Sequence, residues 1–146
     1  MALIERGEGK ELRKKRCEMA YNILIVDDSQ TMRKIIQKSV VLSGFELGEC
    51  WEAGNGRDAM DVLNSQMVDL ILADLNMPVM NGLEMLKELR KDEKRRGIPV
   101  VLITTEGSEK RLEEAVALGI KGYIQKPFHP EAIRDVLNRI MEGSRA

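Results

Sequence analysis

The strongest constraint on the fold is a set of short, continuous apolar runs at residues 23–26, 70–73 and 100–103. Each run is four residues long and is followed at once by a polar residue. A run of this kind is typical of a strand that is covered on both faces. Because crossover helices cover both faces of a parallel sheet, these runs favour a parallel sheet over a half-exposed antiparallel one.

The segments around these runs complete an alternating pattern of strands and helices. Residues 47–53 are predicted to form an edge strand, because Gly48, Glu49 and Glu52 interrupt their apolar character, and residues 122–125 form a short fifth strand. Apolar positions recur at helical spacing over five further segments, residues 32–40, 59–63, 83–89, 112–116 and 133–141. The sequence therefore predicts an α/β fold, a doubly wound five-stranded parallel sheet with five helices.

The helical stripes also predict which side chains point into the core. In the first helix, which Ser29 is expected to cap, Ile35 and Ile36 belong to the inner stripe. In the fourth helix, over residues 109–118, Ala115 and Val116 are expected to face inward.

Composition limits the function classes. The 146 residues carry a formal net charge of -1, with 43% hydrophobic and 32% charged residues, as expected for one globular domain. A net charge near zero gives no electrostatic basis for binding nucleic acid or an anionic membrane. No apolar run approaches the ~20 residues of a membrane span. Cys17 and Cys50 form no disulfide framework or metal-binding spacing, so we expect a cytoplasmic protein. We also expect a monomer.

Charged and hydroxyl side chains stand at the ends of four predicted strands. Asp27 and Asp28 follow the first strand, Asp74 the third and Lys126 the fifth, and Thr104 ends the fourth. The carboxyl ends of parallel strands meet at one edge of a sheet, so these side chains are expected to converge. Three clustered carboxylates repel one another unless a cation is present, and carboxylate and carbonyl oxygens suit Mg²⁺. We expect Asp74 to attack phosphorus, with Lys126 and Thr104 stabilising the phosphoryl oxygens.

In combination and order, these motifs make the chain resemble the response-regulator receiver domains of two-component signalling, over about residues 21–142. The motifs that carry the resemblance are Ile23-Leu-Ile-Val-Asp27-Asp28-Ser, Leu72-Ala-Asp74-Leu-Asn-Met-Pro78-Val-Met-Asn-Gly82, Val101-Leu-Ile-Thr104-Thr and Gly122-Tyr-Ile-Gln-Lys126-Pro127-Phe128. The resemblance implies the flavodoxin-like strand order 2-1-3-4-5. It places a receiver domain at residues 21–146. Residues 1–20 are expected to be an N-terminal extension, either a solvated tail or the result of a start placed upstream of Met19.

The resemblance also implies the chemistry of the site. Receiver domains take a phosphoryl group from a phosphohistidine of a histidine kinase onto the residue that matches Asp74. Mg²⁺ is then held by Asp28, by Asp74 and by the backbone carbonyl of Asn76, with Asp27 acting through water. Lys126 pairs with a phosphoryl oxygen. The resemblance implies a protein that assists its own phosphorylation and dephosphorylation but is consumed as a reactant, so we do not expect a conventional turnover enzyme.

The resemblance also implies how the protein changes conformation on phosphorylation. Thr104 is expected to move toward the phosphoryl group, and Tyr123 to turn inward as Thr104 shifts. The peptide bond between Lys126 and Pro127 is expected to be cis. The added charge on Asp74 thus biases a two-state element, as in other phosphorylation switches.

The pair Asn76 and Glu106 resembles that of the CheY-like, single-domain chemotaxis type and influences the lifetime of the acyl phosphate and the access of a phosphatase. We expect no output domain after the last helix, so the signal passes through a surface formed by residues 109–118, residues 122–125 and that helix. The expected target is the flagellar motor switch.

Three alternatives stay open at this point. The chain is a phosphorelay intermediate if it passes the phosphoryl group on to a histidine phosphotransfer protein. A phosphatase with an aspartyl nucleophile is a second alternative, although such enzymes commonly carry two carboxylates at alternate positions after the first strand, whereas Asp27 and Asp28 are adjacent. A flavin-binding module is the third, although aromatic residues make up only 3% of the chain.

Overall fold

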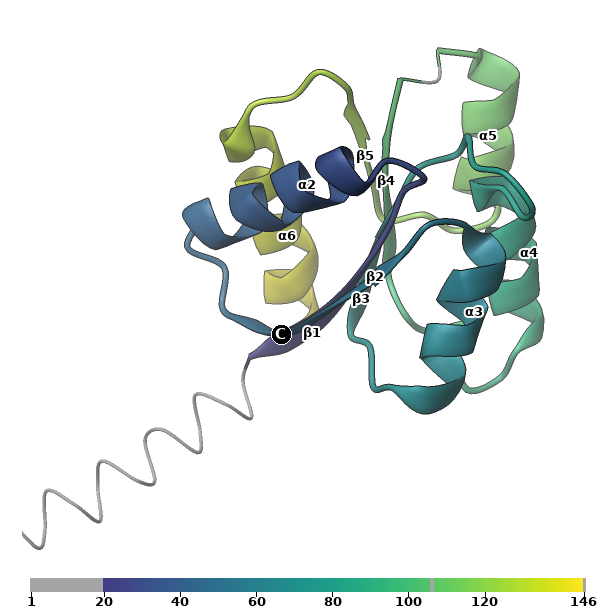
Figure 1. Cartoon of the computed structure of the whole chain (residues 1–146), viewed down its shortest axis with the longest axis horizontal. Helices are drawn as coiled ribbons and strands as arrows, with labels where there is room; N and C mark the ends of the chain where they lie inside the picture. The colour runs from purple at the N-terminus through teal and green to yellow at the C-terminus, as the bar shows by residue number, and fades with distance from the viewer. Residues whose placement is uncertain (1–19, 106, 146) are drawn as a thin grey trace, which may run out of the picture.

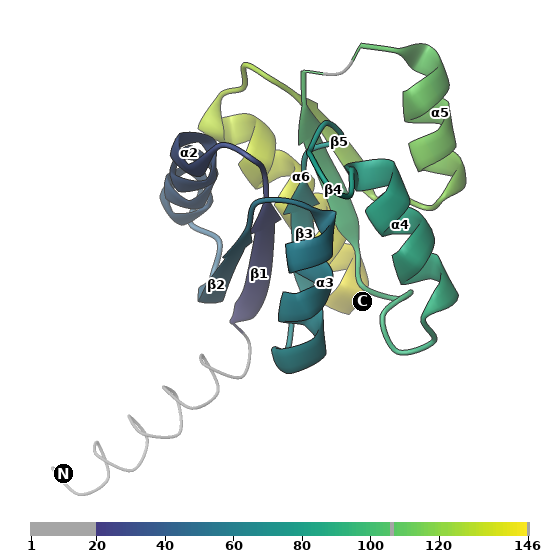
Figure 2. The same cartoon turned by 45° about the vertical axis from the view of Figure 1, so that its right-hand side comes forward.

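The computed structural model describes residues 20–105 and 107–145 and confirms the predicted α/β fold. The elements are β1 (Tyr21–Val26), α2 (Gln30–Leu42), β2 (Leu47–Ala53), α3 (Gly56–Ser65), β3 (Leu70–Ala73), α4 (Gly82–Lys91), β4 (Val100–Thr104), α5 (Glu109–Ala117), β5 (Gly122–Gln125) and α6 (Pro130–Arg145). The five strands are all parallel and lie in the order β2-β1-β3-β4-β5. The sheet is covered by α2 and α6 on one face and by α3, α4 and α5 on the other (Figures 1 and 2).

Side-chain caps explain where three of the helices begin. The Ser29 hydroxyl and the Asn55 and Asn81 amide oxygens each accept a hydrogen bond from a backbone N–H in the first turn of α2, α3 and α4. Asn81 forms a full capping box, because the Glu84 carboxylate also accepts from the Asn81 N–H. These caps set the loops that leave the carboxyl ends of β1, β2 and β3.

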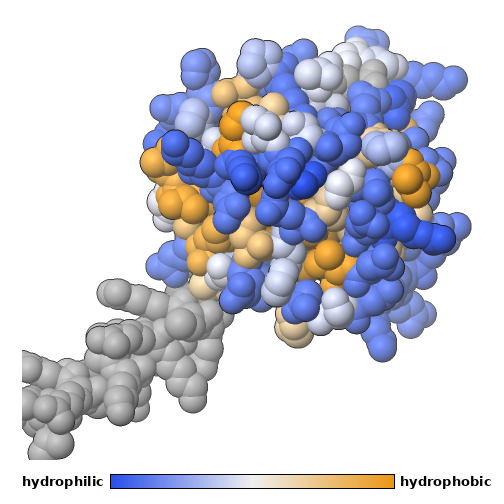
Figure 3. Space-filling view, viewed as in Figure 1, coloured by the Kyte–Doolittle hydropathy of each residue, from blue (hydrophilic) through white to orange (hydrophobic). Residues whose placement is uncertain are grey.

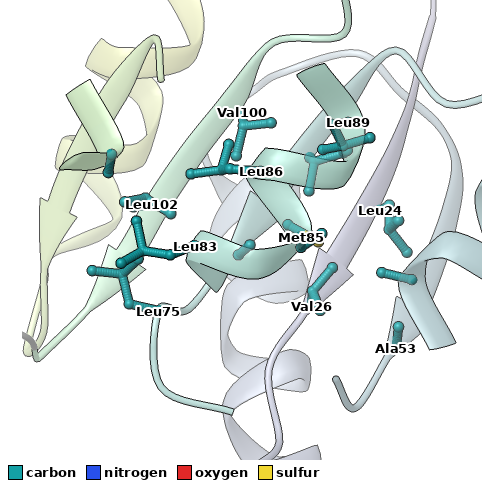
Figure 4. Close-up of a cluster of buried hydrophobic side chains, with 14 of the residues drawn as sticks. Leu24, Val26, Ala53, Leu75, Leu83, Met85, Leu86, Leu89, Val100 and Leu102 are labelled. Carbon is teal, nitrogen blue, oxygen red and sulfur yellow. The ribbon is translucent and has the colours of Figure 1, made fainter. Parts of the chain in front are cut away.

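Alternate residues of the central strands pack into two cores, one on each face of the sheet. Leu24 and Val26 of β1 belong to the core under α3, α4 and α5, together with Leu86 and Leu89 of α4 (Figure 4). The intervening residues, such as Ile25, pack under α2 and α6. Residues 23–26, 70–73 and 100–103 are all buried, as the sequence predicts.

Two of the expected core positions are wrong. Val116 is 64% exposed and Ile35 is 46% exposed. In α5, Ala115 alone is fully buried, so the buried stripe of this short helix is narrow and Val116 lies outside it. In α2, the buried stripe follows Ile36 and Val40, and Ile35 lies about 100° around the helix from Ile36.

The surface is mixed in character. On the face seen in Figure 3, hydrophobic residues form small patches that hydrophilic residues separate. Among the described residues, no helix is both long and apolar enough to pass through a bilayer.

Gly82, at the start of α4, lies against the backbone of the β3 end. Its N–H donates to the Leu75 carbonyl at 3.0 Å, and a Cβ added to it would lie 2.5 Å from the backbone carbonyl oxygen of Asp74. Backbone atoms cannot rotate out of the way as a flexible side chain can. A residue without a side chain is therefore needed here to keep Asp74 in place.

We predict that Gly82→Ala lowers the free energy of unfolding by about 1–3 kcal/mol, because the added methyl group forces the Asp74 backbone to shift. Urea denaturation measures the loss. Gly97→Ala is the matched control, since a Cβ there meets nothing within 4 Å, and it is expected to change stability by less than about 0.5 kcal/mol. Equal effects of the two substitutions would contradict this account of Gly82.

Candidate functional site

Backbone hydrogen bonds continue past the ends of the strands and fix the residues that follow them. The Asp27 N–H donates to the Ala53 carbonyl and the Asp74 N–H to the Val26 carbonyl, both at 3.0 Å. The Lys126 N–H donates to the Thr104 carbonyl at 2.9 Å. The parallel sheet therefore brings these side chains to one edge through its backbone pairing, as the alternating sequence pattern predicts.

Lys126 bridges two of the carboxylates. Its ammonium Nζ lies 2.6 Å from Asp27 Oδ2 and 2.9 Å from Asp74 Oδ2. The remaining oxygens accept from backbone N–H groups, Asp27 Oδ1 from Ser29 at 2.9 Å and Asp74 Oδ1 from Asn76 at 3.1 Å. Asp27 and Asp74 are buried, so these contacts replace the water that would otherwise solvate their charges.

The same contacts set the protonation of Lys126. Burial by itself lowers the pKa of this ammonium, but its hydrogen bonds to Asp27 and Asp74 and the charges of both carboxylates outweigh that effect. The net result is a pKa above the ordinary value for lysine. Lys126 therefore carries a fixed positive charge at neutral pH.

Asp27, Asp28 and Asp74 form a cluster with the chemistry of a magnesium site. One oxygen from each lies within 4.8 Å of the others. Three carboxylate oxygens at this spacing would suit Mg²⁺, a hard cation that prefers oxygen ligands. Asp28 is exposed whereas the other two are buried, which leaves an open side for water or a phosphoryl group. The residues fit the expected cation.

Thr104 and Tyr123 lie on the neighbouring strands β4 and β5. Thr104 ends β4 and is fully buried, and Tyr123 is half-buried in β5, where it packs against the core under α3, α4 and α5. The Lys126–Pro127 peptide bond is cis, as the resemblance implied. Glu106, which the sequence analysis linked to phosphate lifetime, lies outside the described residues, as do residues 1–19 of the expected extension.

Two arginines at this edge were missed by the sequence analysis. Arg33 of α2 donates from Nη1 to the Asp27 carbonyl at 2.6 Å and from Nε to the Glu52 carboxylate at 3.1 Å. Arg111 of α5 donates from Nη1 to the side-chain oxygen of Asn76 at 2.6 Å. Both arginines lie on helices and belong to no motif, so only the packing of the helices on the sheet reveals them.

Comparison with known proteins identifies this arrangement. Residues 23–138 match the response regulator receiver domain family. The chain belongs to this family. The strand order β2-β1-β3-β4-β5 is therefore that of a receiver domain.

Curated relatives include chemotaxis proteins of the CheY type. The receiver is 37% identical over 120 residues to a chemotaxis protein CheY homolog of Campylobacter jejuni, covering 82% of this chain and 91% of the relative. It is also 37% identical over 120 residues to chemotaxis protein CheY1 of Helicobacter pylori, covering 82% and 95%. Among solved structures, the chemotaxis response regulator CheY4 of Vibrio cholerae aligns with a TM-score of 0.73 at 33% identity, covering 83% of this chain and 98% of that one.

We predict that Lys126→Met lowers the free energy of unfolding by about 1–3 kcal/mol in the presence of EDTA, because Asp27 and Asp74 lose their shared cation. Urea denaturation with EDTA and then with excess Mg²⁺ measures this loss. A divalent ion supplies replacement positive charge, so the deficit is expected to shrink in Mg²⁺.

Lys110→Met is the control for this test, because Lys110 is an exposed lysine of α5. Lys110→Met is expected to leave the free energy of unfolding nearly unchanged both in EDTA and in excess Mg²⁺. A Lys126→Met deficit that is the same with and without Mg²⁺ would show that the carboxylates do not share a cation site.

Proposed function

We propose that this receiver domain, over residues 21–146, accepts a phosphoryl group on Asp74 from a phosphohistidine of a histidine kinase. The observation that carries the proposal is the placement of Asp74 Oδ2 2.9 Å from the fixed charge of Lys126, within a cluster of three carboxylates. Family membership supports the same reaction class. Asp28, Asp74 and the Asn76 carbonyl would hold Mg²⁺, with Asp27 acting through water, and the ion would supply positive charge that neutralises the phosphoryl oxygens.

The residues of the chain have separate roles in this reaction. A carboxylate oxygen of Asp74 attacks the phosphorus, and the bond from phosphorus to the imidazole nitrogen of the donor breaks. The imidazole leaves with that electron pair, and the product on the receiver is an acyl phosphate. Lys126 moves from its two carboxylates to a phosphoryl oxygen, and the Thr104 hydroxyl donates to another.

The same contacts link phosphorylation to a change in the surface that binds a target. Thr104 and Tyr123 lie on adjacent strands, where Leu102 of β4 pairs with Tyr123 of β5. Movement of Thr104 toward the phosphoryl group leaves space on the side of α5, and the Tyr123 ring turns into it. The new charge on Asp74 therefore shifts the population toward a state with a different surface over α5, β5 and α6.

The outer side of α5 has a shape suited to a protein target. A shallow hollow of about 520 Å³ is lined by Leu112, Val116 and Ala117, with Glu109 and Glu113 beside them. A hollow lined by apolar side chains and two carboxylates fits a segment that carries apolar side chains and a basic residue. We place the target-binding surface here.

Chemotaxis is the output that the names of the relatives favour. We infer the flagellar motor switch as the target and a phosphatase as a further partner. The second candidate is a phosphorelay intermediate that passes the phosphoryl group to a histidine phosphotransfer protein. Binding of a motor switch peptide only after phosphorylation would support the first role. Rapid transfer to a histidine phosphotransfer protein without such binding would support the second.

The phosphoacceptor is tested by intact mass after incubation with Mg²⁺ and acetyl phosphate. We predict one phosphoryl adduct on the wild type, removed by hydroxylamine and prevented by EDTA, and none on Asp74→Asn. Asp135→Asn is the matched control, because Asp135 is an exposed aspartate of α6, and it is expected to be modified like the wild type. An unmodified wild type, or an Asp74→Asn variant that is still modified, would overturn the proposal.

A further inference from the structure

A hydrogen bond joins α5 to the loop after β3. Arg111 Nη1 donates to Asn76 Oδ1 at 2.6 Å, although the two residues are 35 positions apart in the chain. Arg111 is half-buried whereas Asn76 is exposed. The contact therefore ties a helix of the expected target-binding surface to the loop that follows the nucleophile.

Asn76 is also bound to the nucleophile itself. Its backbone N–H donates to Asp74 Oδ1 at 3.1 Å, so its position relative to Asp74 is fixed from the backbone. The side chain of Asn76 extends to the solvent side, from which water must approach. In phosphoryl hydrolysis, an amide side chain at such a place commonly orients the attacking water. The contact with Arg111 engages the side-chain oxygen of Asn76, the atom that would accept a hydrogen bond from that water.

We propose that Arg111 is a positioning residue that holds the Asn76 side-chain oxygen away from the attacking water and so lengthens the life of the acyl phosphate. The proposal rests on phosphorylation of Asp74, as argued above. It also couples output to lifetime, because a partner that moves α5 or binds Arg111 releases Asn76. Such a partner changes the hydrolysis rate without touching Asp74.

The hydrolytic step that Arg111 restrains is simple. The oxygen of a water molecule attacks phosphorus, and the bond between phosphorus and the Asp74 oxygen breaks, with the electron pair returning to the carboxylate. The water proton is released to the phosphate or to solvent. Asn76 Oδ1, when free, accepts a hydrogen bond from this water and holds it in line with the bond that breaks.

A double-mutant cycle on Arg111 and Asn76 tests the proposal. Each protein is phosphorylated with acetyl phosphate, the donor is removed, and loss of the phosphoryl group is followed by intact mass. Arg111→Ala is expected to speed the loss by about two- to fivefold, the effect of a partly exposed charged contact. Asn76→Ala is expected to slow it, and Arg111→Ala is expected to have no further effect in the Asn76→Ala background, because Arg111 acts through Asn76.

Two further variants separate positioning from a general charge effect. Lys110→Ala removes the same charge from the neighbouring position of α5 and is expected to decay like the wild type. Arg111→Lys retains a donor and is expected to decay at an intermediate rate. In the metal-free, unphosphorylated protein, the NMR signal of the Asn76 side-chain amide is expected to shift in Arg111→Ala and to stay in place in Lys110→Ala.

Failure of this inference differs from failure of the proposed function. A wild type that takes up no phosphoryl group would overturn the function itself. A phosphorylated Arg111→Ala that decays at the wild-type rate or more slowly would overturn only the role of Arg111. Acceleration by Arg111→Ala that persists in the Asn76→Ala background would also overturn it, because Arg111 would then act by another route.

Discussion

The ammonium of Lys126, held between two buried carboxylates, is the interaction on which the site depends. Asp27 and Asp74 both contact Lys126 Nζ, at 2.6 and 2.9 Å. The buried negative charges of Asp27 and Asp74 lie on either side of this ammonium, and they would destabilise the fold if no cation lay between them. The same contacts keep Lys126 positively charged, and this charge can attract a phosphoryl group. A single salt-bridged arrangement therefore stabilises the resting protein and prepares it for phosphoryl transfer.

The rest of the architecture fixes the backbone around that lysine. Asp27, Asp74 and Lys126 each lie one position beyond the end of a strand, and the N–H of each donates to a carbonyl of the neighbouring strand. The pairing of the sheet therefore sets their spacing. Gly82 lets α4 begin against the Asp74 carbonyl, and Arg33 holds the Asp27 carbonyl from α2. The main-chain geometry therefore sets the positions of the site residues and requires little of the exposed side chains in the loops.

Much of this arrangement follows from the sequence, and the exceptions have a physical reason. Buried strands need continuous apolar runs and parallel strands need crossovers, so β1, β3 and β4 and the convergence of Asp27, Asp74 and Lys126 were predictable. The spacing of apolar residues in a helix does not show how wide a stripe the sheet covers, and Val116 was therefore placed wrongly. The contact between Arg111 and Asn76 depends on how α5 packs, so no local sequence pattern predicts it.

Binding of Mg²⁺ to the unphosphorylated protein, measured by isothermal titration calorimetry, is the most direct test of the central claim that these carboxylates form a cation-dependent acceptor site. Asp28 is the exposed member of the cluster, so Asp28→Asn removes one charge with little effect on the core. We predict one ion per wild-type chain and an affinity about tenfold lower in Asp28→Asn. A wild type without measurable binding, or an unchanged affinity in the variant, would contradict the account.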